Sequence, residues 1–294
     1  MALNKAVFQT RALTALIFVI VMLTGLLWNY EVFFLLFAIV AAGAWFEYIK
    51  ICSKINQVEL DAASRFILNM FGLLLAITGA LGFLQGNIQI AGFENLSRIL
   101  VFVWIGIPLT AYILLSRRKA LSMFNKMLML AGFAYISIPF ALLFHLRLFD
   151  IPMRDTGIMT GKLIVCGMIF SIWINDTMAY LVGSFIGKTP LSKISPKKTW
   201  EGTIGGIILC IVTISIAGNF IPVAKIISWK HWMAIAAIAA IFGTFGDLLE
   251  SKLKRSAGVK DSGNFMPGHG GFLDRFDSLI LATPFVWVYV NMMI

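Results

Sequence analysis

Charged residues concentrate in one polar segment near the end of the chain, residues 247–277, which lies between two apolar runs. Carboxylate oxygens are the ligands that Mg²⁺ and Mn²⁺ prefer, and lysine and arginine neutralise phosphate oxygens. The segment holds five of the chain's 14 acidic residues, Asp247, Glu250, Asp261, Asp274 and Asp277, among the basic residues Lys252, Lys254, Arg255, Lys260 and Arg275. It therefore predicts a metal and polyphosphate site.

The spacing of these carboxylates suits two helix ends. Asp247, Glu250 and Ser251 stand at i, i+3 and i+4, on one face of a helix, and Asp274 and Asp277 stand at i and i+3. Two such ends joined by a turn would bring their oxygens together. For Glu250 there is a structural alternative, an ion pair one helical turn along the chain with a lysine.

The linker between these two ends is rich in glycine, with Gly263, Gly268, Gly270 and Gly271 around Pro267. Glycine permits tight turns and close approach of backbone N–H groups to an anion. His269 lies among these glycines, and its polar setting favours a phosphate contact or a proton relay over core filling.

A second group of polar residues lies upstream. Asn175 and Asp176 interrupt an apolar run, where an ionisable group is costly and usually faces a bundle interior or an aqueous cavity. The alternative is a packing hydrogen bond from Asn175, with Asp176 paired to a cation. Lys197 and Lys198 follow in a polar loop that could contact phosphate or lipid headgroups.

The composition defines the elements that must position these residues. Hydrophobic residues make up 60% of the chain and charged residues 13%, and the mean hydropathy is +0.89. Soluble domains carry about 25% charged residues. The chain is therefore expected to be an all-α polytopic membrane protein. Its net charge of +10 then fits loops facing an anionic membrane surface, and no nucleic-acid partner is expected.

Nine apolar runs are candidates for crossing a bilayer, since a span needs about 20 residues; the second and the last are short or bordered by charges. With the N-terminus in the cytoplasm, 18 of the 24 Lys and Arg residues fall on the inner side, as the positive-inside tendency requires. Residues 1–150 would supply packing and lipid contact, and residues 151–294 would carry a cytoplasm-facing site. The predicted spans are residues 12–28, 32–48, 66–84, 99–115, 127–144, 163–182, 203–221, 232–249 and 279–294.

Three sequence motifs resemble those of one known family. The run SKLKRSAGVKDSGNFMPGHGGFLDRFD at residues 251–277 resembles the signature of the phosphatidate cytidylyltransferases, also called CDP-diacylglycerol synthases. NDTMAY at residues 175–180 and SPKKTWEG at residues 195–202 resemble further cytoplasmic motifs of that family. The resemblance implies that CTP and phosphatidic acid, the latter from the lipid bilayer, react to give CDP-diacylglycerol and pyrophosphate.

The resemblance also suggests roles for the residues. Asp247 and Asp274 are expected to bind Mg²⁺, with Ser251 and Asp277 completing the metal site; Mn²⁺ is an alternative, and the family implies a paired-metal arrangement that includes a monovalent second ion. The expected catalytic residues are Asp247, Asp274, Lys254, Arg255, His269 and Arg275. The expected substrate-binding residues are Asn175, Asp176, Lys197, Lys198, Lys260 and Asp261.

Two other functions stay open: a CTP-dependent polyprenol kinase and a cation transporter. A transporter would hold its acids near the bilayer midplane, whereas most acids here lie at span ends among cations. The compact length suggests a bacterial inner membrane, with the active site facing the cytoplasm. Whether the chain forms a homodimer is left open.

Overall fold

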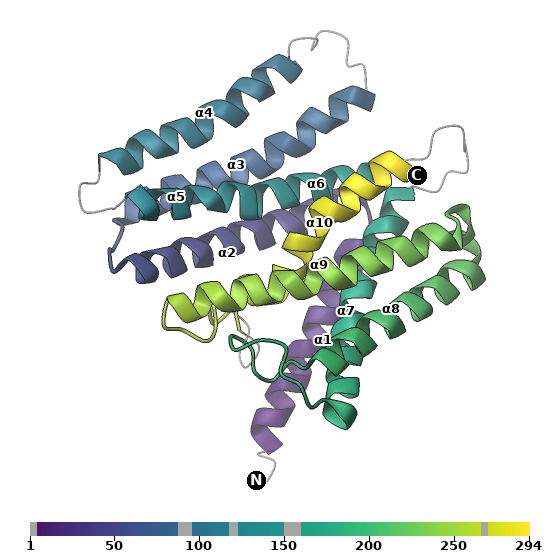
Figure 1. Cartoon of the computed structure of the whole chain (residues 1–294). Coiled ribbons are helices and arrows are strands. Elements are labelled where there is room, and N and C mark those ends of the chain that lie inside the picture. The colour runs from purple at the N-terminus through teal and green to yellow at the C-terminus, as the bar shows by residue number, and fades with distance from the viewer. Residues whose placement is uncertain (1–4, 88–95, 118–122, 150–159, 266–269) are drawn as a thin grey trace. The chain divides into compact units, whose positions relative to one another are not determined.

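The computed structural model describes residues 5–87, 96–117, 123–149, 160–265 and 270–294 (Figure 1). Helices account for nearly all of these residues, and no β-strand is present among them; an isolated β-bridge joins Pro190 and Thr199. The prediction of an all-α membrane protein is confirmed. A chain crossing a bilayer must satisfy its backbone hydrogen bonds internally, and helices do so within each segment.

In the first half of the chain, the described residues form six α-helices and one π-helical turn. They are α1 (Lys5–Leu27), α2 (Tyr30–Asn56), α3 (Ala62–Asn87), α4 (Leu96–Ser116), α5 (Met123–Gly132), η1 (Phe133–Ser137) and α6 (Ile138–Leu148). The second half contains α7 (Thr160–Ile186), α8 (Trp200–Phe220), the 3₁₀ turn η2 (Pro222–Ile226), α9 (Trp229–Ser256) and α10 (Leu273–Met293).

Each of the nine predicted spans overlaps a helix, and α5, η1 and α6 together cover one of them. Among the described residues, seven helical segments are long and apolar enough to cross a membrane, and two shorter apolar stretches lie in α1 and α4. The number of spans and the cytoplasmic N-terminus stay predictions.

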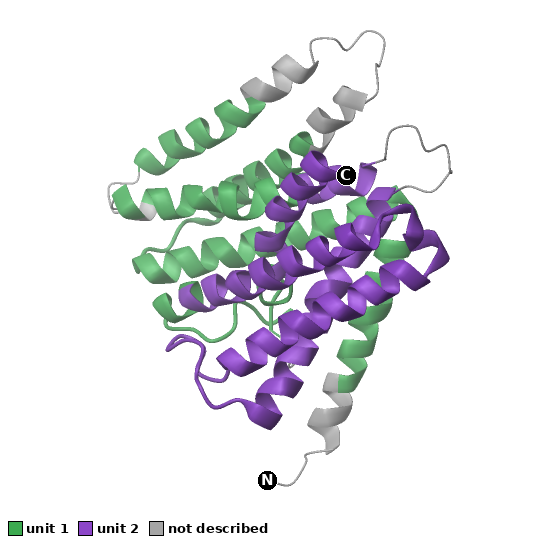
Figure 2. Ribbon diagram, turned by 45° about the vertical axis from the view of Figure 1, so that its right-hand side comes forward, with its two compact units in different colours: residues 1–141, 253–276 green, residues 142–252, 277–294 purple. Residues whose placement is uncertain are grey.

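The chain groups into two compact units (Figure 2). Unit 1 comprises Met1–Ala141 and Leu253–Phe276, and unit 2 comprises Leu142–Lys252 and Asp277–Ile294. This grouping reflects which residues contact one another. It does not test the predicted division of roles at residue 150, which stays a prediction.

In unit 1, the indole of Trp45 organises the packing around α2. Its Nε1 donates to Ser137 Oγ at 3.0 Å, and that hydroxyl donates to the carbonyl of Gly72 at 2.7 Å. Gly72 and Gly132 both lie against the Trp45 ring, where a Cβ would overlap it. The buried side of α2 is thereby fixed against α3 and the π-helical turn.

In unit 2, α7 and α8 pack closely because small residues face each other. A Cβ on Gly202 or Gly206 of α8 would meet Ala179 of α7 at less than van der Waals distance. This close packing of small residues is the usual way in which membrane helices approach each other. It places the loop between α7 and α8, residues 187–199, over one end of the pair.

Candidate active site

Three carboxylates gather in unit 2, where α9 passes α10. Asp247 and Glu250 come from α9 and Asp277 from α10, and one oxygen of each lies within 4.8 Å of the others. Glu250 is fully buried, Asp277 is 7% exposed and Asp247 is partly exposed. Three oxygen donors at this spacing fit a hard divalent cation such as Mg²⁺. We call this group the carboxylate cluster.

Glycine in α9 makes the cluster possible. A Cβ on Gly246 would overlap the backbone carbonyl of Asp277, and a Cβ on Gly243 would lie 3.4 Å from the Ser278 side chain. Because α9 carries no side chain at these positions, its backbone approaches α10 closely. That approach brings Asp247 within reach of Asp277.

Lys198 provides a positive charge at the cluster. Its ammonium forms an ion pair with Asp247. Burial lowers the pKa of Lys198 from its ordinary value, while Asp176 and Asp277 act in the opposite direction. A lysine that has already lost part of its hydration can bind a phosphate oxygen with less further desolvation.

The loop that carries Lys198 is held by its own hydrogen bonds. Glu201 accepts from the backbone N–H groups of Lys188 and Thr189 at 3.2 and 3.1 Å, and Leu191 N donates to the Lys198 carbonyl at 2.7 Å. Thr199 Oγ1 caps α8 by accepting from Gly202 N at 3.1 Å. These contacts give the SPKKTWEG motif a structural role, since they orient the loop that presents Lys198.

The other polar residues predicted in unit 2 differ in their surroundings. Asn175 is buried, and its Nδ2 donates a long hydrogen bond to Thr244 Oγ1 at 3.4 Å. This contact agrees with the alternative in which Asn175 makes a hydrogen bond between packed helices. Asp176 is exposed and interacts electrostatically with Lys198. Ser251 Oγ donates to Asp247 Oδ1 at 3.5 Å, the long limit of a hydrogen bond. Lys197 is exposed.

Asp274 belongs to unit 1, where it accepts several hydrogen bonds. Lys254 pairs with its Oδ1. Its Oδ2 accepts from Ser262 N at 2.9 Å, from Ser262 Oγ at 2.9 Å and from Gly271 N at 2.7 Å. The Asp274 carboxylate therefore organises the linker within unit 1, and its predicted role as a metal ligand stays a prediction.

Glu47 of α2 completes this network, although it lies more than 200 positions earlier in the chain. Its carboxylate accepts from Ser262 Oγ at 2.6 Å, Phe272 N at 3.0 Å and Leu273 N at 2.8 Å. Glu47 is 5% exposed. It caps the N-terminus of α10, where unsatisfied N–H groups favour an anion, and it shares Ser262 with Asp274.

The remaining predicted residues lie on exposed parts of unit 1. Arg255 Nη1 donates to the Val259 carbonyl at 3.2 Å, and Arg275 is exposed. Lys260 and Asp261 are exposed and line a polar pocket. His269 lies outside the described residues.

Sequence reasoning gave no functional role to Glu47 and left Glu250 open between a ligand and an ion-pair partner. For Glu250, the signal was its position one helical turn from Asp247. For Glu47, the signal was a single acid within an apolar run, the same signal that singled out Asp176.

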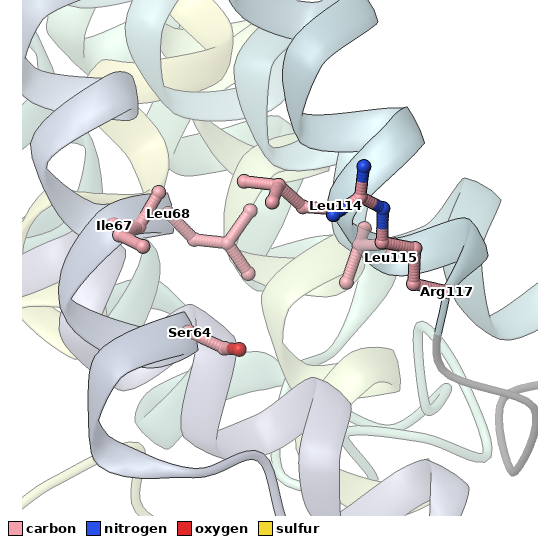
Figure 3. Close-up of a pocket in the computed structure, with 6 residues that line it drawn as sticks. All are labelled: Ser64, Ile67, Leu68, Leu114, Leu115 and Arg117. Carbon is pink, nitrogen blue, oxygen red and sulfur yellow. The ribbon is translucent and has the colours of Figure 1, made fainter.

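An apolar pocket of about 320 Å³ lies elsewhere in unit 1, between α3 and α4 (Figure 3). Ile67, Leu68, Leu114 and Leu115 line it, with Ser64 and Arg117 as its polar members. Its lining contains no carboxylate, so it offers no ligand set for a divalent metal.

Comparison with known proteins relates the chain to one family. Residues 9–293 match the cytidylyltransferase family. The phosphatidate cytidylyltransferase of Staphylococcus haemolyticus is 31% identical over 277 residues, which cover 94% of this chain and 96% of that protein. The Bacillus subtilis phosphatidate cytidylyltransferase is 48% identical over 40% of this chain and 43% of that protein.

A chloroplast relative from Arabidopsis thaliana, phosphatidate cytidylyltransferase 5, is 43% identical over 46% of this chain. The matched region spans 33% of that plant protein, so the chain covers only a minor part of it. The match to residues 9–293 and the likeness to the staphylococcal protein extend over nearly the whole chain. The chain therefore belongs to the cytidylyltransferase family.

Proposed function

We propose that the chain is a phosphatidate cytidylyltransferase that converts CTP and phosphatidic acid into CDP-diacylglycerol and pyrophosphate. The family membership, the motif at residues 251–277 and the staphylococcal relative support this assignment. The observation that carries it is the carboxylate cluster with Lys198 beside it, because it combines ligands for a divalent cation with a group that neutralises phosphate.

The reaction joins two phosphate groups. An oxygen of the lipid phosphate attacks the α-phosphorus of CTP, the bond from that phosphorus to the bridging oxygen of the β-phosphate breaks, and pyrophosphate leaves with that oxygen. A phosphate monoester has its second pKa near about 6, so the attacking group is already largely dianionic at neutral pH. The protein therefore needs no strong general base and must chiefly reduce repulsion and align the reactants.

Mg²⁺ is the metal we propose for the cluster, with Mn²⁺ as an alternative. Asp247, Glu250 and Asp277 would hold it, because their oxygens already converge within 4.8 Å. When bound, such an ion neutralises charge on phosphate oxygens and polarises the phosphorus under attack. We keep Ser251 and Asp274 as further predicted ligands, and a monovalent second ion as a prediction.

The protein's own residues would complete the electrostatics. Lys198 is oriented by a hydrogen-bonded loop and could exchange its contact with Asp247 for one with a phosphate oxygen. Lys254 lies beside Asp274 in unit 1. Fixed cations of this kind stabilise a phosphoryl transition state without needing to reorganise during the reaction.

We also propose the location of the site. Lys198 and the predicted cations of residues 250–277 lie in segments that the charge bias assigns to the cytoplasmic side. Phosphatidic acid would approach from the inner leaflet of a bacterial inner membrane, and CTP from the cytoplasm.

The experiment uses the purified full-length chain, dioleoyl phosphatidate, Mg²⁺ and CTP labelled on either the α- or the γ-phosphate. Cytidylyl transfer moves the α-label into the lipid and releases the γ-label as pyrophosphate. A polyprenol kinase, offered polyprenol, would instead move the γ-label into the lipid, and a transporter would move neither. Absence of α-labelled lipid from folded protein would reject the proposal.

A further inference from the structure

A polar pocket in unit 1 lies between the end of α2 and the loop that follows α9. Its volume is about 230 Å³, and it is lined by Lys50, Ile51 and Lys54 of α2 together with residues 259–264. The loop contributes Lys260 and Asp261 to the lining. The pocket thus joins the first half of the chain, where no chemistry was expected, to the motif at residues 251–277.

The charge of this lining is unbalanced, with three ammonium groups against the carboxylate of Asp261. Lys50 and Lys54 stand at i and i+4, and like charges at this spacing on a helix repel each other. The fold adds Lys260 to the same pocket from a distant segment. An anion that contacts all three lysines would offset this repulsion, and the three ammonium groups would attract it into the pocket.

Ordinary helix chemistry accounts for only one of these lysines. Lys54 lies in the last turn of α2, where a cation complements the helix dipole. Lys50 is a full turn earlier, and Lys260 belongs to another segment. The general excess of cations on a cytoplasmic surface does not require that they share a pocket.

The loop wall of the pocket is rigid, because the Glu47 and Asp274 contacts hold it. Ser262 lines the pocket, and its hydroxyl shares its single proton between two carboxylates, with Oγ at 2.6 Å from Glu47 and at 2.9 Å from Asp274. A Cβ on Gly263 would overlap the Glu47 carboxylate. A preformed wall lowers the entropy lost when a ligand binds, and Ser262 links the pocket directly to Asp274.

The size of the pocket limits what it can hold. Pockets that enclose drug-sized ligands have volumes of about 300–1,000 Å³. A hollow of about 230 Å³ is better matched to the charged end of a ligand than to a whole nucleotide or lipid.

We propose that this pocket binds a phosphate group of an anionic substrate, held by the ammonium groups of Lys50, Lys54 and Lys260. The inference rests on the proposed function, which supplies two sources of that chemistry: the triphosphate of CTP and the phosphate monoester of phosphatidic acid. We expect the lysines to contact oxygens of that phosphate that form no new bond, so that the pocket contributes binding energy shared by the ground and transition states.

The test compares the full-length Lys50→Gln/Lys54→Gln double variant with wild type and with Lys188→Gln/Lys193→Gln. The control pair is exposed, lies in the loop of residues 187–199 and removes the same charge. We expect the KM of one substrate to rise by about tenfold or more, as loss of charge-assisted hydrogen bonds does, with kcat unchanged within about twofold. A rise for CTP assigns the triphosphate, and a rise for phosphatidate assigns the lipid phosphate.

The proposal is overturned if both KM values match those of the control pair. A wild-type chain that makes no CDP-lipid would instead reject the proposed function. A second measurement tests the pocket if the wild type is inactive or if the double variant does not fold. It measures by mass spectrometry how far each lysine of the wild-type chain is acetylated by a chemical reagent. CTP, or phosphatidate vesicles compared with phosphatidylcholine vesicles, should protect Lys50, Lys54 and Lys260. Protection no greater than at Lys188 and Lys193 would overturn it.

Discussion

The carboxylate of Glu47, on α2, accepts a hydrogen bond from the backbone N–H of Leu273, the first residue of α10, at 2.8 Å. Two further donors, Ser262 Oγ and Phe272 N, share the same buried carboxylate. A helix of the N-terminal half thus caps the helix in which the motif at residues 251–277 ends. The position of Ser262, and through it that of Asp274, depends on this contact.

Replacing Glu47 with Gln should therefore weaken both the fold and the reaction. Gln keeps the volume but removes the charge from three hydrogen bonds, and hydrogen bonds to charged groups contribute about 1.5–3 kcal/mol each. We expect a lower melting temperature in detergent and an activity loss of about tenfold or more in the protein that stays folded. Glu59→Gln, an exposed control, should change stability by less than about 0.5 kcal/mol. Equal melting temperatures of Glu47→Gln and Glu59→Gln would contradict a capping role for Glu47.

Asp247→Asn and Asp277→Asn should each remove most of the Mg²⁺-dependent activity. Each replaces a charged oxygen of the cluster with a neutral amide, and a metal that stabilises the transition state contributes several kcal/mol, so a loss of about a hundredfold or more is expected. Mg²⁺ should raise the melting temperature of the wild type, and this shift should shrink in both variants. Asp61→Asn is the control, because Asn caps a helix as well as Asp does. If Mg²⁺ raises the melting temperature of both variants as much as that of the wild type, the cluster is excluded as the metal site.

The membrane fold was predictable because its physical signal is local. An apolar run of about 20 residues in a bilayer has helix as its low-energy state, so hydropathy alone located the segments. The helix ends were less predictable. The span predicted to end at residue 249 continues as α9 to Ser256, because hydropathy marks the bilayer core while the polar turn beyond it still forms a helix. Gly258, with φ of +67°, follows that end.

The candidate site was predictable only to the level of helix faces. The i, i+3 spacing placed Asp247 with Glu250 and Asp274 with Asp277, but it could not tell which residues of α9 each carboxylate of α10 meets. Asp277 joins the cluster, whereas Asp274 pairs with Lys254. Glu47 could not be found from spacing, because its partner Ser262 lies 215 positions away and only tertiary packing brings the two together.

Gly246→Ala tests whether the close approach of α9 to α10 builds the cluster. The added Cβ would overlap the Asp277 carbonyl, so the helices must separate, at a cost of about 1–3 kcal/mol. We expect a lower melting temperature and weaker Mg²⁺ stabilisation. The matched control is Gly106→Ala in α4, where no atom lies within 4 Å of the added Cβ and helix stability should rise by about 0.5–1 kcal/mol. Unchanged Mg²⁺ stabilisation in Gly246→Ala would show that the cluster does not need this contact.

Lys198→Gln should have opposite effects on metal binding and on turnover. The Lys198 ammonium pairs with Asp247 and so repels a divalent cation at the same carboxylates. Two unit charges at about 4 Å interact by about 4 kcal/mol near a protein surface. Without that charge, Mg²⁺ should bind the substrate-free protein about threefold more tightly or better, as measured by calorimetry. Turnover should fall by about tenfold or more, because we propose that the same ammonium neutralises substrate phosphate.

Two further variants separate this dual role of Lys198 from a loss of loop structure. Lys198→Arg keeps the charge and should retain most of the turnover and the wild-type Mg²⁺ affinity. Lys193→Gln removes an exposed charge from the same loop and should change neither quantity. If Lys198→Gln binds Mg²⁺ more weakly than wild type, its ammonium supports the cluster by orienting Asp247, and competition with the metal is excluded. If turnover is also unchanged, Lys198 contributes nothing to phosphate neutralisation, and that role must pass to other predicted cations, of which Lys254 lies beside Asp274.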